Sequence, residues 1–214
     1  MGCVSNAGEK EMKILVACEC SGRVRDAFRK LGHDAWSCDI KESETPSKYH
    51  IQDDVRNYLH KCPTDGKGWD MMIAHPPCTY LCRNRDARNK KDNPFINALN
   101  VYEGKQLFEL LLNAPIAKIC IENAVPALAI GLPKYTQIIQ PYQHGHDHSK
   151  KTCLWLKGLP NLQPTKIVEV TYVTTKNGHR YTRGWYETPR NSTDRSRTFT
   201  GIATAMADQW GGKI

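Results

Sequence analysis

Residues 70–82 read DMMIAHPPCTYLC, a stretch that joins an apolar run to a stiff turn carrying a thiol. The run at 71–74 is short and unbroken, which is typical of a strand buried on both faces. Pro76 and Pro77 fix their own φ angles and restrict the residues before them, so the turn is rigid. Cys78 follows at once. A nucleophile gains from such a turn because its position is set before substrate arrives; the alternative is a structural thiol at a strand end.

Similar apolar runs recur along the chain and alternate with amphipathic helical patterns. Strands are predicted at 12–18, 35–40, 49–55, 70–75, 117–123, 136–141 and 152–158, and helices at 22–32 and 96–112. The second helix is expected to place Leu99, Leu107, Leu110 and Leu111 on one buried face. The alternation predicts an α/β fold, a mostly parallel sheet with helices on both faces.

Polar and reactive residues follow four of these predicted strands. They are Cys18 and Glu19, Asp39, the Pro-Pro-Cys turn, and Glu122 with Asn123. In parallel sheets, ligands bind at the carboxyl ends of the strands. The sequence therefore predicts one site at this edge, hereafter the rim. Glu122 is the notable acid there, since a carboxylate that ends a buried strand is costly unless it is paired or used. The alternative is a cap for a helix that follows Val125 and Pro126.

The overall composition indicates which class of partner the protein binds and in which cellular compartment it works. The 214 residues carry a formal charge of +8, which favours an anionic partner such as nucleic acid, nucleotide or phosphate. Nine cysteines without a Cys-x-x-Cys pair, and no apolar run long enough for a bilayer, predict a reduced cytoplasmic protein without membrane contact.

The motifs HPPC (75–78) and ENAVP (122–126), in this order, resemble the DNA cytosine carbon-5 methyltransferases. The resemblance runs with gaps over 13–157 and again near 195–212. It implies a Rossmann-like methyltransferase fold that uses S-adenosylmethionine. Carried over, Cys78 is the nucleophile that adds to cytosine carbon 6, and Glu122 holds ring nitrogen 3 and the exocyclic amine. Carbon 5 then accepts the methyl group, chemistry that a thiolate and a nearby acid support.

The same resemblance implies a cofactor site at the first three strands. The implied cofactor-binding residues are Cys18, Glu19, Cys20, Gly22, Asp39, Ile40, Asp54 and Pro77. Asp39 matches the acid that binds the ribose hydroxyls, and Asp54 the acid near the adenine amine, with Asp53 as its rival. Only Gly22 remains of the family's glycine-rich loop. The alternative for Asp39 and Asp54 is that they are solvated loop acids.

Basic residues are the implied contacts to the substrate. The predicted substrate-binding residues are Pro76, Asn123, Arg83, Arg85, Lys150 and Lys151. The basic stretch 83–91 matches a loop that closes over DNA in the family, and its alternative is a solvated charged loop. Lys150 and Lys151 stand where the family has arginines, and lysine lacks the bidentate fork of arginine. The histidines of HGHDH (144–148) lack a cysteine pair at ligand spacing, so a loop bordering the site is favoured over zinc, and no metal is predicted.

The predicted organisation has four parts. Residues 1–11 form a polar extension, 12–157 the methyltransferase core, 158–195 a basic, aromatic β-hairpin around Asn177-Gly178, and 196–214 a helix that returns to the core. Tyr172, Tyr181, Trp185 and Tyr186 are interleaved with basic residues in the hairpin. It is a candidate for a reduced target recognition element, in place of the large recognition domain of the family. A sheet extension and a dimerisation arm are the alternatives.

The predicted function is therefore that of a compact, phage-type cytosine carbon-5 methyltransferase. Its expected partner is DNA with the target base flipped out, because a ring inside a duplex cannot reach a thiol on the rim. Two alternatives remain open. The same chemistry acts on a free pyrimidine nucleotide or RNA, or the chain is a catalytically inactive relative that binds nucleic acid.

Overall fold

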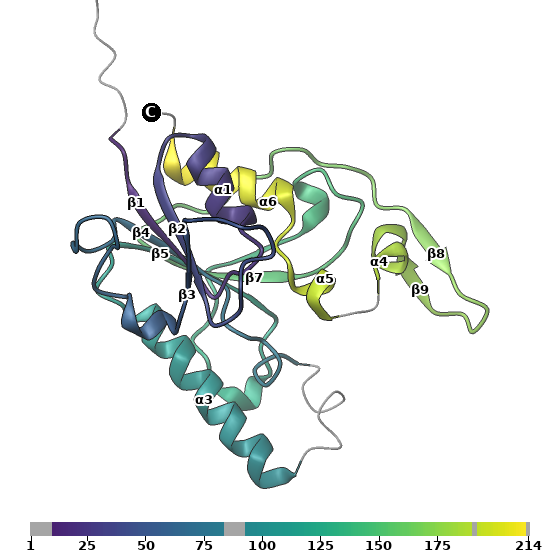
Figure 1. The fold of residues 1–214 in the computed structure, drawn as a ribbon. Helices are drawn as coiled ribbons and strands as arrows, with labels where there is room; N and C mark the ends of the chain where they lie inside the picture. Colours follow the sequence, from purple (N-terminus) through teal and green to yellow (C-terminus); the bar gives the residue numbers. More distant parts are fainter. Residues whose placement is uncertain (1–9, 84–92, 190–191, 213–214) are drawn as a thin grey trace, which may run out of the picture.

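The fold is a seven-stranded sheet covered by helices, with a two-stranded hairpin beside it (Figure 1). The computed structural model describes residues 10–83, 93–189 and 192–212, so the predicted extension falls largely outside them. The strands of the large sheet are β1 (Lys13–Ala17), β2 (Asp34–Asp39), β3 (His50–Gln52), β4 (Met71–Ala74), β5 (Lys118–Ala124), β6 (Gln137–Ile139) and β7 (Thr152–Lys157). The longer helices are α1 (Arg23–Lys30), α3 (Pro94–Leu112) and α6 (Thr200–Met206), the last continued by the π-helix η4 (Ala207–Gly211).

The strand order is β3-β2-β1-β4-β5-β7-β6. The first five of these strands pair in parallel, and β7 runs antiparallel to both β5 and β6. The predicted α/β class is confirmed: the sheet is mostly parallel, and helices cover both of its faces. Its carboxyl ends, together with the start of the reversed strand β7, form the rim.

Two hydrophobic cores hold helices against the two faces of the sheet. One core packs α1 and α6 against the sheet through residues such as Phe28, Ile73 and Ile202. The other packs α3 on the opposite face through Phe108 and Leu111. Since both faces are covered, β1 and β4 are buried almost without alternation, which explains their unbroken apolar sequences.

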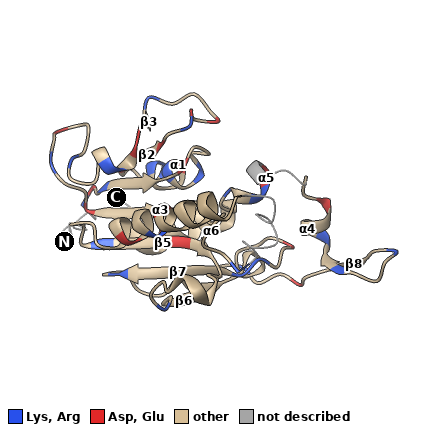
Figure 2. Cartoon of the chain, turned by 90° about the horizontal axis from the view of Figure 1, so that it is seen from below, with Lys and Arg blue, Asp and Glu red and all other residues tan. Residues whose placement is uncertain are grey.

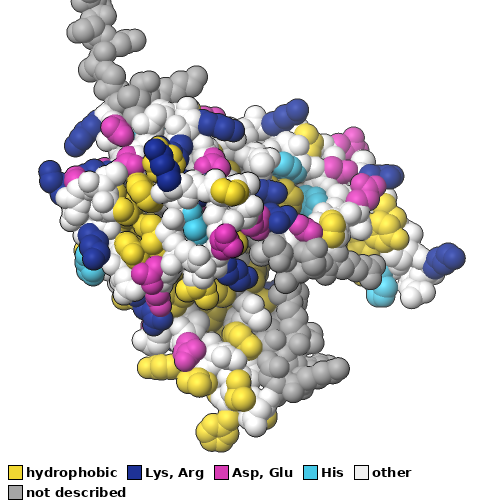
Figure 3. Space-filling view, in the orientation of Figure 1, with side chains coloured by type: hydrophobic (Ala, Val, Ile, Leu, Met, Phe, Trp, Pro, Cys, Tyr) yellow, Lys and Arg dark blue, Asp and Glu magenta, His cyan; other side chains and the backbone are white. Residues whose placement is uncertain are grey.

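The buried face of α3 differs from the predicted one. Leu99 and Leu110 are 55% and 42% exposed, whereas Phe108 and Leu111 are fully buried. Only the second half of α3 rests on the sheet, and its first turns extend beyond it and expose Phe95 (88%). Figure 3 shows hydrophobic side chains gathered at this end of the molecule. The leucine spacing failed as a guide because it presumed that the whole helix is covered.

The basic hairpin is confirmed but is shorter than its alternating sequence predicts. Strands β8 (Tyr172–Thr174) and β9 (Arg180–Thr182) pair across a turn at Gly178, whose φ of +78° suits glycine. The expected second strand then turns into the short helix α4 (Arg183–Glu187), and α5 (Ser192–Ser196) follows. Figure 2 shows this arm extending beyond the carboxyl end of β5. In the described part of the chain, no helix is long and apolar enough to cross a membrane.

Gly158, directly after β7, lies in close contact with the backbone just before β5. Gly158 has a φ of +63°, and an added Cβ would lie 2.3 Å from the backbone oxygen of Ala117. Gly131 has a similar φ of +66°, but a Cβ there would meet only the end of Lys105, at 3.7 Å. Gly158→Ala should lower the free energy of unfolding by about 2–4 kcal/mol and Gly131→Ala by about 1 kcal/mol, measured by urea titration. Equal losses would contradict a steric role of Gly158.

Candidate active site

The pairing of β4 with β5 brings the two predicted catalytic residues to one place on the rim. The strands are parallel with Ala74 opposite Ile121, so both run out at the same edge. The loops beyond them are joined as well: Leu81 O accepts from Ala127 N at 2.9 Å, and Cys82 forms a β-bridge with Pro126. Cys78 therefore lies in the loop after β4, and Glu122 lies in the neighbouring strand β5, near its carboxyl end.

Glu122 has protein partners that the sequence analysis did not assign. His75 Nδ1 lies 3.1 Å from Glu122 Oε2, and the hydroxyl of Thr198 donates to the same oxygen at 3.1 Å. The His75 and Glu122 side chains are 15% and 11% exposed. Strand alternation places both on the face covered by α1 and α6, which is why Thr198, just before α6, reaches them. His75 is the first residue of the HPPC motif, whereas no pattern in the sequence indicated that Thr198 would contact Glu122.

The electrostatics of this pair favour its charged form. Burial alone would lower the pKa of His75, but the hydrogen bond and the charge of Glu122 outweigh it and raise the pKa. Burial would likewise raise the pKa of Glu122, but the His75 contacts and the charge of Lys150 outweigh it and lower the pKa. The two side chains therefore form an ion pair at the rim.

The Pro-Pro-Cys turn is fixed from the neighbouring strand. Asn123 Nδ2 donates to the backbone oxygen of Pro76 at 2.9 Å, and both residues are buried. Asn123 Oδ1 is buried as well and has no hydrogen-bond partner among the described residues. Pro77 is exposed and Cys78 is half-buried, so the turn presents its second half at the surface. Of the predicted substrate residues, Pro76 and Asn123 thus lie next to the candidate nucleophile.

The predicted basic contacts divide into three groups. Lys150 lies at the rim, donates from Nζ to the backbone oxygen of Arg195 at 3.0 Å, and affects Glu122 as described above. Lys151 and Arg83 are exposed, at the start of β7 and after the Cys78 turn. Arg85 lies outside the described residues.

The predicted cofactor residues gather at the ends of β1, β2 and β3. Cys18 has a φ of +58°, the left-handed conformation that bulky residues avoid, and it directs the chain into the loop before α1. Burial, with the nearby charges of Asp39 and Asp54 as smaller causes, raises the pKa of the Cys18 thiol to about 12. Cys20 Sγ lies 4.0 Å from Glu44 Oε1. The structure brings these positions together; only Pro77 belongs to the neighbouring β4 loop.

Side chains of the protein occupy the place where the family has its glycine-rich loop. Glu19 is buried, and its carboxylate accepts from the backbone N–H groups of Val24 at 2.8 Å and Arg25 at 3.4 Å, which caps α1. Gly22 has a φ of +72°, and an added Cβ would lie 2.2 Å from the guanidinium of Arg25. The first turn of α1 is thus satisfied internally, so these residues do not fit an anionic group of a cofactor.

The ends of β2 and β3 fit the nucleoside part of a cofactor better. Asp39 uses Oδ1 to accept from Lys41 N at 2.9 Å, which leaves acceptor capacity for hydroxyl groups. Ile40 beside it is 73% exposed, an apolar surface suited to a flat heterocycle. Asp54 caps η1 (Val55–Asn57) and pairs with Arg56, whose Nε lies 2.9 Å from Oδ1, and this contact lowers the pKa of Asp54.

The three histidines of 144–148 pack the arm and α6 against the core. His146 Nε2 accepts from the backbone N–H of Gly201 at 2.9 Å, and an added Cβ at Gly184 would lie 2.3 Å from His148 Nδ1. Burial, chiefly, lowers the pKa of His144, His146 and His148. Among the described residues, no three His, Cys, Asp or Glu side chains are placed to hold a metal ion.

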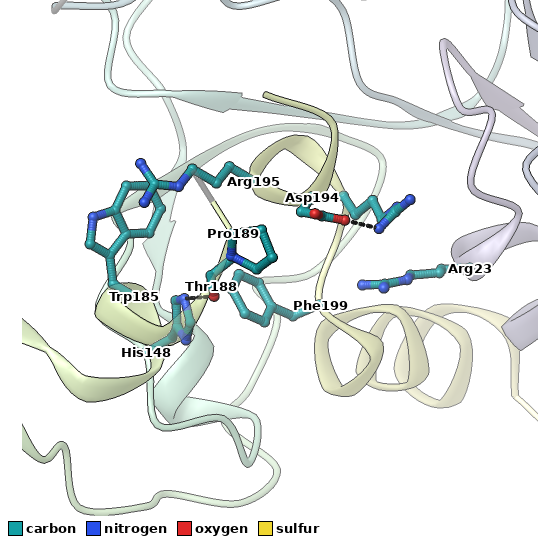
Figure 4. A pocket seen from close by; sticks show the side chains of 9 residues that line it. Arg23, His148, Trp185, Thr188, Pro189, Asp194, Arg195 and Phe199 are labelled. Carbon is teal, nitrogen blue, oxygen red and sulfur yellow. Dashed lines mark hydrogen bonds and ion pairs between the residues drawn. The ribbon is translucent and has the colours of Figure 1, made fainter. Parts of the chain in front are cut away.

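Two cavities border the rim on the side of the arm. The first, about 290 Å³, is lined by Arg23, Arg195 and Arg197 together with Trp185 and Phe199 (Figure 4). The second, about 310 Å³, is lined by Lys150, Tyr172, Arg180, Tyr181 and Trp185, among others. The interleaved aromatic and basic residues of the hairpin were the signal for the second cavity. Nothing in the sequence indicated that Arg23 of α1 and Arg195 of α5 would line the same cavity.

No family model matches the chain, and no curated protein matches it. Solved structures with a similar fold include the following three. The first is an E. coli prophage protein described as a DNA modification methyltransferase (15% identity, TM-score 0.47, 75% of this chain and 53% of that chain). The second is a methyltransferase of Entamoeba histolytica (14%, 0.40, 77% and 59%), and the third is the Dnmt2 methyltransferase of S. pombe (16%, 0.41, 71% and 51%). This chain thus spans between half and three fifths of their lengths.

The His75–Glu122 pair should make stability depend on pH. The raised pKa of His75 means that its contribution is present below its ordinary value of 6.5 and is lost as pH rises through the folded-state value. The lowered pKa of Glu122 means that its contribution is present above 4.5 and is lost as pH falls. His75→Gln should therefore cost about 1.5–3 kcal/mol at about pH 5.5 and less at about pH 8.5, in urea titrations.

His144, His146 and His148, whose pKa values burial lowers, are present in both proteins, so their effect cancels in the difference between wild type and variant. A loss that is the same at both pH values would contradict the ion pair.

Proposed function

We propose that the chain is an S-adenosylmethionine-dependent methyltransferase that modifies carbon 5 of cytosine in DNA, through a covalent adduct with Cys78. The observation that carries the proposal is that a proline-fixed turn with a thiol follows β4, and that the adjacent strand β5 carries the largely buried carboxylate of Glu122. The methyltransferase fold and the motifs HPPC and ENAVP support it. The comparisons are too distant to add to the argument.

Cys78 is assigned the role of nucleophile. It reacts as the thiolate, its proton having passed to solvent: the sulfur forms a bond to carbon 6 of the ring, while ring nitrogen 3 takes a proton from the His75–Glu122 pair. S-adenosylmethionine, when bound, supplies the methyl group that carbon 5 accepts. Water then takes the carbon-5 proton, the sulfur–carbon bond breaks to release the Cys78 thiolate, and the proton on ring nitrogen 3 returns to the His75–Glu122 pair. Pro76, held by Asn123, keeps the turn in place throughout, so little reorganisation is needed when the base arrives.

Glu122 is assigned to the Watson–Crick edge of the base, and His75 is its positioning residue. The carboxylate accepts from the exocyclic amine with one oxygen, while His75 and Thr198 hold the other. Because the pKa of His75 is raised, a proton is available beside Glu122 when the ring nitrogen requires one. The base must leave the stack to reach this edge.

Asp39 and Ile40 are assigned to the adenosine part of the cofactor, with Asp54 or Asp53 near the adenine. The spare acceptor capacity of Asp39 and the exposed side chain of Ile40 support this assignment. We also propose that 158–195 is a reduced target recognition element attached to a core of 12–157, because its basic, aromatic arm borders the rim. Arg83 and Lys151 are proposed to contact phosphates.

A second candidate function is nucleic-acid binding without methyl transfer. Two observations favour it, both at the loop where the family uses glycines. Glu19 caps the start of α1, and the guanidinium of Arg25 occupies the space beside Gly22. Incubation of genomic DNA with labelled cofactor, followed by nucleoside analysis, distinguishes the two. Binding without any labelled nucleoside would support this second candidate.

Glu122→Gln should slow formation of 5-methylcytosine by about 10²–10⁴-fold, because the neutral amide breaks the His75–Glu122 pair that supplies the proton. DNA affinity, measured by gel shift, should stay nearly unchanged. Glu109→Gln is the control, since Glu109 makes only a surface ion pair with Lys105 on α3. Equal rates for Glu122→Gln and wild type would overturn the assigned role.

A further inference from the structure

The two cavities beside the rim share one wall, the indole of Trp185. Trp185 belongs to α4, and α4 is pressed against the 144–148 loop so closely that a Cβ at Gly184 would lie 2.2 Å from Asp147 O. His148 lies against Trp185 at 6.1 Å between ring centroids and against Phe199 at 4.8 Å. The indole is therefore held by the core, not carried freely on the arm.

The first cavity combines positive charge with apolar walls. Arg195 lies over the Trp185 ring at 4.1 Å, and its buried Nε has no hydrogen-bond partner within the part of the chain that the structure describes. Arg197 is neutralised by Asp194 and Glu44. Arg23 donates one N–H to Thr198 O at 2.9 Å, and Figure 4 shows it on the opposite side of Phe199 from Arg195. A guanidinium that is fixed by stacking and has an unpartnered Nε is suited to a phosphate.

The second cavity provides further aromatic surface. Arg180 lies over the Tyr172 ring at 4.0 Å, and Tyr181, Lys150 and Trp185 line the same cavity. Each cavity is near the lower limit for ligand pockets, so each admits a single base or nucleotide and neither admits stacked base pairs. Basic groups that alternate with aromatic rings are typical of proteins that bind single strands.

Each cavity is linked to Glu122 through one residue that lines it or lies next to its lining. Thr198, which donates to Glu122, lies between Arg197 and Phe199 of the first cavity. Lys150, which lines the second, lowers the pKa of Glu122 by its charge. A strand that crosses Trp185 would therefore pass beside the position assigned to the target base.

We propose that Trp185 and Arg195 bind unstacked nucleotides of a single-stranded nucleic acid, with Arg195 on a phosphate and bases against Trp185. This inference deepens the proposed function, because it specifies a single strand as the form of the substrate. It rests on the proposed function only for the identity of the neighbouring target base. The binding step itself requires no chemistry at Cys78.

The test measures affinity by fluorescence anisotropy, with full-length protein and a labelled oligonucleotide of about 12 nucleotides, long enough to cover the arm. Single-stranded DNA, single-stranded RNA and the DNA duplex are compared, because DNA and RNA present the same phosphates and bases. The variants are Trp185→Ala and Arg195→Ala. Trp185→Phe keeps a ring and serves if Trp185→Ala does not fold, as judged by circular dichroism.

Matched controls are available. Tyr186→Ala removes the next aromatic residue of α4, which is 45% exposed and lines neither cavity. Lys67→Ala removes one positive charge from the loop before β4, at the edge of the sheet opposite the rim. Both should change affinity less than about twofold, since neither touches the proposed path.

Trp185→Ala and Arg195→Ala should each weaken single-strand binding about tenfold or more, and duplex binding much less. Arg195→Ala should also reduce the slope of log affinity against log salt by about 0.7, the value for one lost phosphate contact. Equal losses on single strand and duplex, or no loss on either, would overturn the inference. RNA and DNA affinities that depend equally on Trp185 support binding through the shared phosphates and bases.

The inference and the proposed function fail separately. If 5-methylcytosine forms while Trp185→Ala and Arg195→Ala bind single strands as wild type does, the inference is wrong and the methyltransferase assignment stands. If binding depends on Trp185 and Arg195 but no methylated nucleoside forms, the inference stands and the methyltransferase assignment is wrong.

Discussion

The parallel pairing of β4 with β5 is the constraint on which the candidate site depends. It places Ala74 opposite Ile121, so the residues that follow, His75 and Glu122, emerge side by side and form an ion pair. A slip of the pairing by one residue would send Glu122 to the other face of the sheet, away from Thr198. The hydrogen bond from Asn123 to Pro76 then ties the rigid turn to the same strand, and Cys78 is placed by both.

The rim is filled by side chains on one side of the His75–Glu122 pair and is open on the other side. Toward β1 and β2, the chain fills its own loop: Glu19 caps α1, and Arg25 occupies the space beside Gly22. Toward β7, the rim opens into two cavities lined by arginines and aromatic rings, with Trp185 between them. The side of the arm therefore has the more open surface, which agrees with a small protein that recognises nucleic acid through a short arm.

Much of the fold could be predicted from the sequence, because buried strands have unbroken apolar runs and glycines mark turns. The rim could be predicted too, since in a parallel sheet the residues after each strand meet at one edge. Pairing between distant segments could not. Thr198 and Arg195 reach the site only because α6 packs beside α1, and no local pattern encodes that contact. The exposed start of α3 was missed for the same reason, since spacing gives a helix face but not how much of it is covered.

The central claim is that the Cys78 thiol attacks a cytosine ring gripped beside it. Mass spectrometry of the protein after incubation with S-adenosylmethionine and an oligonucleotide containing 5-fluorocytosine tests this most directly. Release of the cysteine requires loss of a proton from carbon 5, and fluorine at that carbon cannot be removed as a cation, so the adduct is trapped. The account predicts an oligonucleotide bonded to the peptide that contains Cys78, and none in Cys78→Ser. A trapped adduct at a different cysteine, or none on any cytosine substrate, would contradict it.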